Sequence, residues 1–172
     1  MNLWHRINPI TKRGINCIIE IPSGSTKKYE LDKFSGKFIL SRATFPILKY
    51  NYGFIPRTLA EDNDPLDVLV LGKKRSRGSI VECKVIALLK MQDEKSWDNK
   101  ILAVPINDMD LDYIKNVKDV PKSVLIDIKG FFRHYKDKYN KKTKVFKWLP
   151  CSKALLEIRK SMNNYGKLKN VL

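Results

Sequence analysis

Cysteine, histidine and long apolar runs are scarce in this sequence of 172 residues. Its three cysteines, Cys17, Cys83 and Cys151, are widely spaced and form no Cys-x-x-Cys pair, and the only histidines are His5 and His134. This scarcity argues against a disulfide framework and a zinc site, and predicts reduced thiols in a cytoplasmic protein. The N-terminus lacks a signal peptide's apolar core, and no run could span a bilayer, so we expect no membrane partner.

Basic residues outnumber acidic ones, with 34 Lys and Arg against 18 Asp and Glu, and the formal net charge is +16. A surface this basic predicts attraction to anionic partners, which include nucleic acid. Lysine outnumbers arginine, however, and arginine is the preferred residue for contacts with bases and phosphates. We therefore regard nucleic acid as an unlikely partner on charge alone.

Short apolar or alternating segments separated by turns fill the first two thirds of the chain. The segments predicted to be strands are 15–21, 28–31, 37–40, 67–71, 79–91 and 101–106, with one more at 144–148. The last third has helical spacing, with one helix from Pro121 and a second from about Ser152 to Gly166. Without an internal repeat or linker, this predicts one α+β domain over 1–172, a mostly antiparallel barrel with flanking C-terminal helices.

Three aspartates, Asp62, Asp64 and Asp67, lie in the segment Glu61–Val70, which runs directly into an apolar strand. Carboxylates this close repel one another unless a cation neutralises them. Short carboxylates at the end of a strand suit a hard divalent cation such as Mg²⁺, which prefers oxygen ligands. A solvated acidic turn is the alternative interpretation of this segment.

A second acidic pair, Asp93 and Asp98, follows the predicted strand 79–91. A barrel can bring such strand ends together at one rim, although an ordinary charged turn would have the same composition. Cations and tyrosines that could converge on the aspartates are dispersed along the chain: Lys28, Arg42, Tyr52, Lys100, Tyr135 and Lys136. Aspartates that hold metal ions, together with cations that bind an anionic substrate, would form a site for phosphate chemistry.

The segment Glu61–Val70 resembles the D-x-D-P-x-D-V-L-V signature of family I soluble inorganic pyrophosphatases. Further resemblances to this family run in unbroken order over roughly residues 3–160. They comprise I-E-I-P at 19–22, K-Y-E-L-D at 28–32, N-Y-G-F-I-P at 51–56, the M-x-D-E and D-x-K segments within 90–100, and F-F-R-H-Y-K at 131–136.

The resemblance, to the bacterial type, implies Mg²⁺-dependent hydrolysis of pyrophosphate to two orthophosphates, with Mn²⁺ or another divalent cation as a substitute. It also implies an OB-like five-stranded antiparallel β-barrel and a homohexamer. The metal ligands implied are Asp62, Asp67, Asp93, Asp98, Glu20 and Glu30. The catalytic residues implied are Asp64, as general base, and Tyr52, close to the nucleophile. The substrate-binding residues implied are Lys28, Arg42, Tyr52, Lys100, Tyr135 and Lys136.

The sequence departs from the family pattern just before Tyr52, where one active-site tyrosine has no clear counterpart. Either Tyr50 substitutes for it or Leu48 occupies its position. The glycine usual between the first two aspartates is Asn63, which tolerates a left-handed backbone.

Two other functions remain as alternatives: a basic OB-like nucleic-acid-binding protein and a catalytically silent relative of the pyrophosphatases. The acidic set argues against the first, because it would repel a phosphate backbone unless metal ions filled the cavity. The presence of nearly every catalytic residue argues against the second.

Overall fold

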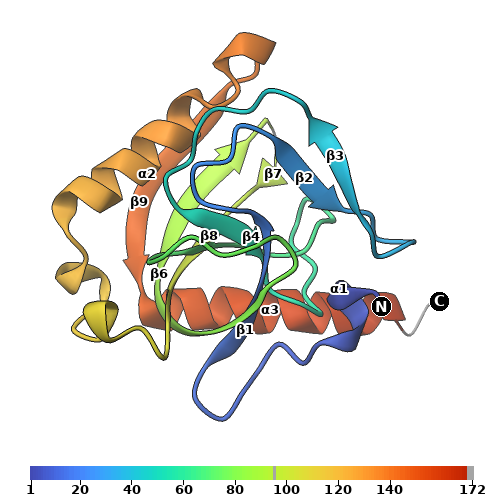
Figure 1. Cartoon of the computed structure of the whole chain (residues 1–172), viewed down its shortest axis with the longest axis horizontal. Coiled ribbons are helices and arrows are strands. Elements are labelled where there is room, and N and C mark those ends of the chain that lie inside the picture. Colours follow the sequence, from blue (N-terminus) through green and yellow to red (C-terminus); the bar gives the residue numbers. More distant parts are fainter. Residues whose placement is uncertain (95, 170–172) are drawn as a thin grey trace.

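The computed structural model describes residues 1–94 and 96–169, and Figure 1 shows their arrangement. The strands of the main sheet are β1 (Ile15–Ile21), β4 (Asn51–Phe54), β5 (Asp67–Val70), β6 (Ile80–Asp93), β7 (Ser96–Trp97), β8 (Lys100–Pro105) and β9 (Thr143–Pro150). A separate hairpin consists of β2 (Lys28–Leu31) and β3 (Phe38–Arg42). The α-helices are α1 (Leu3–Arg6), α2 (Lys122–His134) and α3 (Cys151–Lys169), and 3₁₀ turns lie at Met109–Leu111, Val117–Asp119 and Asp137–Tyr139.

The main sheet closes on itself as a ring, because β1, β4, β5, β8 and β6 pair in that order and β6 pairs back with β1. The long strand β6 makes this possible by pairing with β1 near its start and with β8 and β9 further along. The mixed α+β class is therefore confirmed, as are the strands predicted at 15–21, 28–31 and 79–91 to within a residue or two at their ends.

The pairing of β5 with β8 is parallel, so the prediction of an antiparallel barrel is wrong at this point. The reason is that β6 runs the chain back across the molecule, and β8 then starts at the same end of the ring as β5. Val68 consequently faces Ile101 in the register, and the residues that begin the two strands, Asp67 and Lys100, become neighbours. This one parallel pair brings together two residues that are widely separated in sequence.

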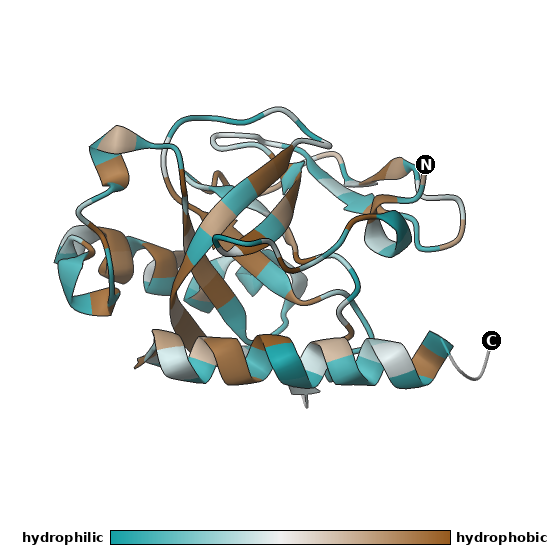
Figure 2. Ribbon diagram, turned by 90° about the horizontal axis from the view of Figure 1, so that it is seen from below, coloured by the Kyte–Doolittle hydropathy of each residue, from teal (hydrophilic) through white to brown (hydrophobic). Residues whose placement is uncertain are grey.

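Helix α3 lies along one side of the ring and α2 covers another side beside β9 (Figures 1 and 2). The buried residues of α3, Ala154, Ile158, Ser161 and Tyr165, recur at three- and four-residue spacings and form one face. That face packs on the strands in part through Ala154 and Ile158, which join the apolar cluster containing Val68 and Ile101.

The prediction that the second helix ends at Gly166 is wrong, since α3 continues to Lys169. A Cβ atom at Gly166 would meet no atom within 4 Å, so neither a turn nor a close contact requires glycine there. An exposed glycine within a helix lowers the stability of the helix by only about 1 kcal/mol. Tyr165 holds this last turn, because its ring packs edge-on against Trp4 with the ring centroids 5.5 Å apart.

Strand β4 and the short elements α1 and β7 were not predicted from the pattern of apolar residues. In β4 the obstacle is Gly53, which disfavours a strand on propensity. The structure requires glycine there because a Cβ atom would lie 1.8 Å from the carbonyl oxygen of Ile18 on β1. The close approach of β1 and β4 thus depends on a residue that weakens the strand signal. None of the helices in the described part of the chain is long and apolar enough to cross a bilayer.

Candidate active site

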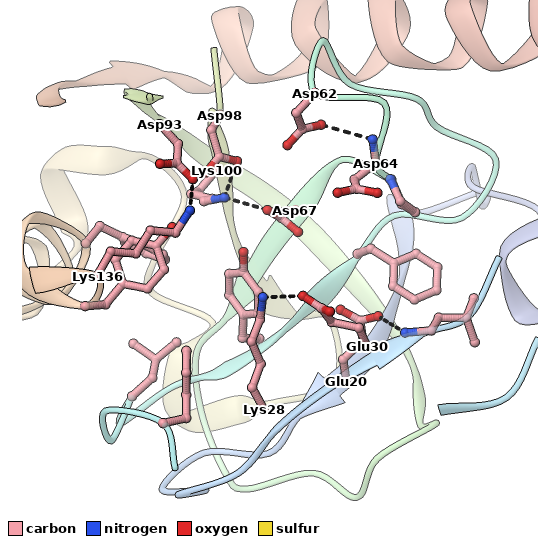
Figure 3. Close-up of a pocket in the computed structure, with 18 of the residues that line it drawn as sticks. Glu20, Lys28, Glu30, Asp62, Asp64, Asp67, Asp93, Asp98, Lys100 and Lys136 are labelled. Carbon is pink, nitrogen blue, oxygen red and sulfur yellow. Dashed lines mark hydrogen bonds and ion pairs between the residues drawn. The ribbon is translucent and has the colours of Figure 1, made fainter. Parts of the chain in front are cut away.

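The carboxylates of the signature lie in the loop between β4 and β5 and at the start of β5 itself. This loop is tightly turned: the backbone N–H of Asp64 donates to Asp62 Oδ1 at 3.1 Å, and Ala60 N–H donates to the Asp64 carbonyl at 2.8 Å. Asn63 adopts a left-handed backbone with φ of 66°, as its place in the signature predicted. The turn presents Asp62, Asp64 and Asp67 toward one cavity (Figure 3).

Lys100 lies at the centre of the acidic side, where its ammonium group pairs with both Asp67 and Asp98. The lysine side chain is only 2% exposed, and the rings of Tyr52 and Phe132 lie 5.8 and 5.5 Å from its nitrogen. Burial opposes the charge, but Asp67 and Asp98 outweigh it and raise the pKa of Lys100 well above its usual value. Lys100 is therefore a permanent cation buried between two carboxylates.

Asp98 and Glu20 are carboxyl groups that keep their protons to a higher pH than usual. Burial, opposed by Lys100, raises the pKa of Asp98 to about 6. Burial raises the pKa of Glu20 to about 8, although Glu20 Oε1 accepts a hydrogen bond from Leu31 N–H at 2.8 Å. Asp62 shows the same trend, because burial and then Asp67 raise its pKa. Without metal ions, burial on this side of the cavity thus favours the protonated, neutral form of these carboxyl groups.

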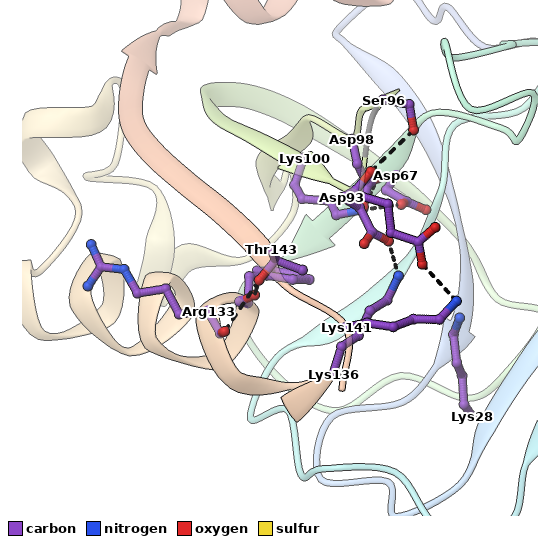
Figure 4. Close-up of polar contacts among 12 residues, drawn as sticks. Lys28, Asp67, Asp93, Ser96, Asp98, Lys100, Arg133, Lys136, Lys141 and Thr143 are labelled. Carbon is purple, nitrogen blue, oxygen red and sulfur yellow. Dashed lines mark hydrogen bonds and ion pairs between the residues drawn. The ribbon is translucent and has the colours of Figure 1, made fainter. Parts of the chain in front are cut away.

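Asp93 and Lys136 form a second ion pair, which joins the end of β6 to the second residue after α2 (Figure 4). The other carboxylate oxygen of Asp93 is buried and accepts no hydrogen bond from residues 1–94 or 96–169. Beside this pair, Lys141 contacts Glu94 at 2.7 Å, so cations from the segment after α2 line up along the carboxylates at the end of β6. An unsatisfied buried carboxylate oxygen is a position that can accept a cation.

The hairpin supplies the opposite wall of the cavity. Lys28 and Arg42 are directly opposite each other in the β2–β3 register, and Lys28 pairs with Glu30 on its own strand. Glu30 is partly buried, yet Lys28 lowers its pKa. Like charges directly across a strand pair repel, so this end of the hairpin would be stabilised by an anion.

Two tyrosines complete the interior. Tyr52 on β4 is buried and its ring centroid lies 6.1 Å from that of Phe132, while Tyr135 caps α2 and lies 5.4 Å from the same ring. Burial raises the pKa of both hydroxyl groups, and Asp67 adds to the effect at Tyr52. Both tyrosines therefore stay protonated and can donate hydrogen bonds at neutral pH.

The cavity has a volume of about 330 Å³. Among the residues predicted for the site, those that line it are Glu20, Lys28, Glu30, Tyr52, Asp62, Asp64, Asp67, Asp93, Asp98, Lys100, Tyr135 and Lys136. Arg42 does not line it; its guanidinium group lies over the ring of Tyr139, 4.5 Å from the centroid, and Nη1 is buried without a hydrogen-bond partner in the described part of the chain. The predicted residues thus converge from seven separate segments, and Arg42 lies beside the others.

Lys33 lines the cavity but was not predicted. It lies in the turn of the hairpin, and its ammonium group donates to Asp64 Oδ1 at 2.7 Å and to the Asn63 carbonyl at 2.9 Å. Its position directly after the K-Y-E-L-D segment was the available signal. Lys33 ties the tip of the hairpin to the acidic loop.

The two residues considered for the missing tyrosine lie in different places. Leu48 is buried and lines the cavity. Tyr50 lies outside the lining, and its hydroxyl donates to Asp127 on α2 at 3.0 Å. Of the two, only Leu48 faces the cavity, and its side chain is apolar.

The donor set fits a hard divalent cation. Every candidate ligand in the cavity is a carboxylate, and no histidine or cysteine is among the lining residues of the described chain. Within residues 1–94 and 96–169 no three acidic, histidine or cysteine side chains are gathered closely enough to hold an ion as they stand. Lys100 and Lys136 pair with three of the carboxylates, so two positive charges face three acidic groups. A bound cation would further stabilise the ionised form of the buried Glu20 and the Asp93 oxygen that has no hydrogen-bond partner among the described residues.

Comparisons with known proteins agree with this geometry. The family model described as inorganic pyrophosphatase matches residues 17–166. An inorganic pyrophosphatase of Aquifex pyrophilus is 44% identical over 159 residues, which cover 89% of this chain and 90% of the relative. One from Campylobacter jejuni is 42% identical over 157 residues, covering 88% and 91%.

A solved structure gives the same result in three dimensions. The inorganic pyrophosphatase from Thermus thermophilus superimposes with a TM-score of 0.90 at 39% identity, and the match covers 96% of this chain and 99% of that one. The resemblance seen in the signature, the matching family model and the superimposed fold therefore agree, and this chain belongs to the inorganic pyrophosphatase family.

Proposed function

We propose that this protein hydrolyses inorganic pyrophosphate to two orthophosphates in a divalent-metal-dependent reaction. The observation that carries the proposal is the cavity itself, in which carboxylates from the ring face cations from the hairpin in a chain of the pyrophosphatase family. Pyrophosphate is small and highly charged, and a cavity of about 330 Å³ with both signs of charge suits it together with metal ions.

Six carboxylates are proposed to hold Mg²⁺: Asp62, Asp67, Asp93, Asp98, Glu20 and Glu30. Bound divalent ions would supply a water of lowered pKa and would neutralise charge on the phosphates. Asp67 is the central ligand in this proposal, because it lies beside Lys100 and Asp98 and raises the pKa of Asp62 and Tyr52. Mn²⁺ or another hard divalent ion would fit the same oxygen donors.

The substrate-binding groups are proposed to be Lys28, Arg42, Lys100, Tyr135, Lys136 and Tyr52. To bind substrate, Lys100 and Lys136 must replace some of their hydrogen bonds to aspartates with hydrogen bonds to phosphate oxygens. Tyr135 and Tyr52 donate hydroxyl hydrogen bonds, since their raised pKa keeps them protonated. Arg42 must turn from Tyr139 toward the cavity, where its guanidinium group can bind two oxygens at once.

Asp64 is the proposed general base, with Tyr52 close to the attacking water. The Asp64 side chain is 62% exposed and bonded to Lys33, and a carboxylate placed there can accept a proton from water. Tyr52 lies deeper and orients that water through its hydroxyl group. No covalent nucleophile is required, since water attacks the phosphorus directly.

The test is phosphate release from pyrophosphate with Mg²⁺ and with a chelator, for the native chain, Asp67→Asn and Asp110→Asn. Asp110 is an exposed aspartate in the turn Met109–Leu111, outside the cavity lining, and controls for loss of one negative charge. We expect Mg²⁺-dependent release that falls by at least about 100-fold in Asp67→Asn and is unchanged in Asp110→Asn. Well-folded, Mg²⁺-loaded native protein without phosphate release would refute the proposal and favour the nucleic-acid alternative.

Further proposals concern architecture and assembly. We propose that the closed ring of β1, β4, β5, β8 and β6 is an OB-like barrel, and that residues 1–172 form one pyrophosphatase domain. We also propose a homohexamer, supported by the exposed apolar side chains of Ile126 on α2 and of Leu155 and Leu156 on α3. Light scattering should then give a mass about six times the 20.0 kDa of the chain. A cytoplasmic location is proposed from the three unpaired cysteines.

A further inference from the structure

The β2–β3 hairpin carries three of the proposed site residues, Lys28, Glu30 and Arg42, yet it is a two-stranded sheet outside the main ring. An isolated two-stranded hairpin is only marginally stable in water, so its position depends on side-chain contacts with the ring. One such contact is already described: Glu20 on β1 accepts a hydrogen bond from Leu31 N–H at the end of β2. A second contact comes from the loop that joins β5 to β6.

Arg77 in that loop bridges β1 and β2. Its Nε donates to the backbone carbonyl of Glu20 at 3.1 Å, and its guanidinium carbon lies 3.4 Å from the centroid of the Tyr29 ring. Tyr29 lies between Lys28 and Glu30 on β2. The arginine thus contacts one proposed site residue, Glu20, and the neighbour of two others, although it does not itself line the cavity.

The loop that carries Arg77 is itself firmly held. The fully buried amide of Asn51 accepts a hydrogen bond from Arg75 N–H at 2.8 Å and donates one to the Lys73 carbonyl at 3.0 Å. Gly78 N–H, one residue after Arg77, donates to the Ile19 carbonyl on β1 at 2.8 Å. Arg77 therefore projects from a backbone fixed to the ring on both sides.

The charge of Arg77 has no other partner in the described chain, since none of the ion pairs among those residues includes it. Its planar guanidinium group is instead used for stacking and for one backbone hydrogen bond, a combination that lysine cannot reproduce.

We propose that Arg77 is a positioning residue for substrate binding, which fixes the β2–β3 hairpin against β1 by stacking on Tyr29 and bonding to the Glu20 carbonyl. This inference rests on the proposed function for its kinetic consequence. Five of the six proposed metal ligands lie outside the hairpin, which carries only Glu30 of that set, so at saturating Mg²⁺ loosening the hairpin should weaken substrate binding through Lys28 and Arg42 more than it slows the bound complex.

The test uses the full-length protein with four variants: Arg77→Gln, Tyr29→Leu, Tyr29→Phe and Lys74→Gln. Tyr29→Phe keeps the ring and is the conservative rescue. Lys74→Gln removes one positive charge from the same loop at an exposed side chain, and so controls for long-range attraction of the anionic substrate. Tyr29→Leu removes the same stacking contact from the other side, so the inference can still be tested if Arg77→Gln does not fold.

Two measurements are made on each variant. The first is hydrogen exchange of the amides in residues 28–42 without substrate or metal, relative to those of β6. The second is kcat and KM for pyrophosphate at saturating Mg²⁺. For Arg77→Gln and Tyr29→Leu we expect faster exchange in the hairpin alone and a KM raised by roughly three- to tenfold, with kcat within about twofold. Tyr29→Phe and Lys74→Gln should match the native protein in both measurements.

The inference is overturned if hairpin exchange in Arg77→Gln and Tyr29→Leu equals that of the native protein. It is also overturned if kcat falls while KM stays constant, or if Lys74→Gln raises KM as much as Arg77→Gln does. If the native protein releases no phosphate, the proposed function fails and the kinetic role with it. The exchange measurement still decides in that case whether Arg77 anchors the hairpin.

Discussion

The acidic end of the ring and the β2–β3 hairpin face each other across one cavity, but they are built in different ways (Figure 3). Asp67, Asp98 and Lys100 lie on or beside ring strands, and the lysine and Asp98 are buried. On the hairpin, Lys28 and Glu30 are only partly buried, and the two strands pair with each other alone. The difference teaches that the ring side of the site, which carries most of the proposed metal ligands, belongs to the core, whereas the hairpin side, with Lys28, Glu30 and Arg42, depends on a few contacts between elements.

That comparison predicts distinct consequences for substitutions on the two sides. Changes on the ring side should alter stability and metal dependence, because a buried charge is left without its partner. Changes on the hairpin should alter KM, because the strands can shift without disturbing the core. The following substitutions test this division, from the largest expected effect to the smallest.

Lys100→Met should have the largest effect on stability. It leaves Asp67 and Asp98 side by side without the cation that now neutralises them, so we expect a loss of about 3 kcal/mol in the free energy of unfolding without metal. The loss should shrink at pH 5, where Asp98, whose pKa is already raised to about 6, takes up a proton. Urea unfolding with a chelator and with Mg²⁺ measures this, and saturating Mg²⁺ should restore part of the stability. An equal loss at pH 5 and pH 8 would argue against charge as the cause.

Glu20→Gln tests the residue of the ring strand β1 that is hydrogen-bonded to Leu31 on the hairpin. The pKa of Glu20 is raised from 4.5 to about 8, so between these values the folded protein holds a proton that the unfolded chain has lost. Stability without metal should therefore fall as pH rises across that window, by up to about 1.4 kcal/mol per pH unit. Gln cannot ionise, yet its side-chain oxygen can still accept from Leu31 N–H.

Metal-free Glu20→Gln should thus equal the native protein near pH 4.5 and exceed its stability above pH 8. Urea unfolding with a chelator across this pH range is the measurement. Glu157→Gln on α3, which lies outside the cavity lining, serves as the control and should follow the native curve. A native stability that does not fall between pH 5 and pH 8 would contradict the raised pKa.

Arg42→Lys should raise the KM for pyrophosphate by roughly tenfold and leave kcat within about twofold. Lysine keeps the charge but loses the fork that binds two phosphate oxygens, a difference of about 1.4 kcal/mol in binding. Steady-state kinetics at saturating Mg²⁺ provide the test. Lys37→Gln, at an exposed position just before β3, is the control, and a similar KM change there would indicate general electrostatic attraction.

Tyr139→Leu should have the smallest effect, a KM lowered by roughly two- to fourfold, because Arg42 must leave this ring to reach substrate. The substitution removes the ring that holds the Arg42 guanidinium group at 4.5 Å, and such a contact contributes about 0.5–1 kcal/mol at a partly exposed site. Tyr139→Phe keeps the ring and should match the native protein in the same assay. An unchanged KM in Tyr139→Leu would mean that this contact does not compete with substrate binding by Arg42.

Much of the fold could be predicted from local sequence. The strands at 15–21 and 79–91 have β-branched apolar runs bounded by turn residues, and α2 has apolar residues at helical spacing, so propensity and burial agree. Prediction failed where a tertiary contact overrides propensity. Gly53 lies in a strand because β1 approaches closely, and α3 continues through Gly166 because Tyr165 packs on Trp4.

The sequence by itself determined the chemical content of the site. The spacing of Asp62, Asp64 and Asp67 before an apolar strand already indicates a cation-binding loop, because close carboxylates need positive charge wherever the loop lies. The tertiary structure alone decided which groups meet. The parallel pairing of β5 with β8 puts Lys100 between Asp67 and Asp98, and the loop after β5 puts Arg77 on Tyr29. Such contacts depend on strand order and loop path, which are set by burial of the whole core and leave no local signal.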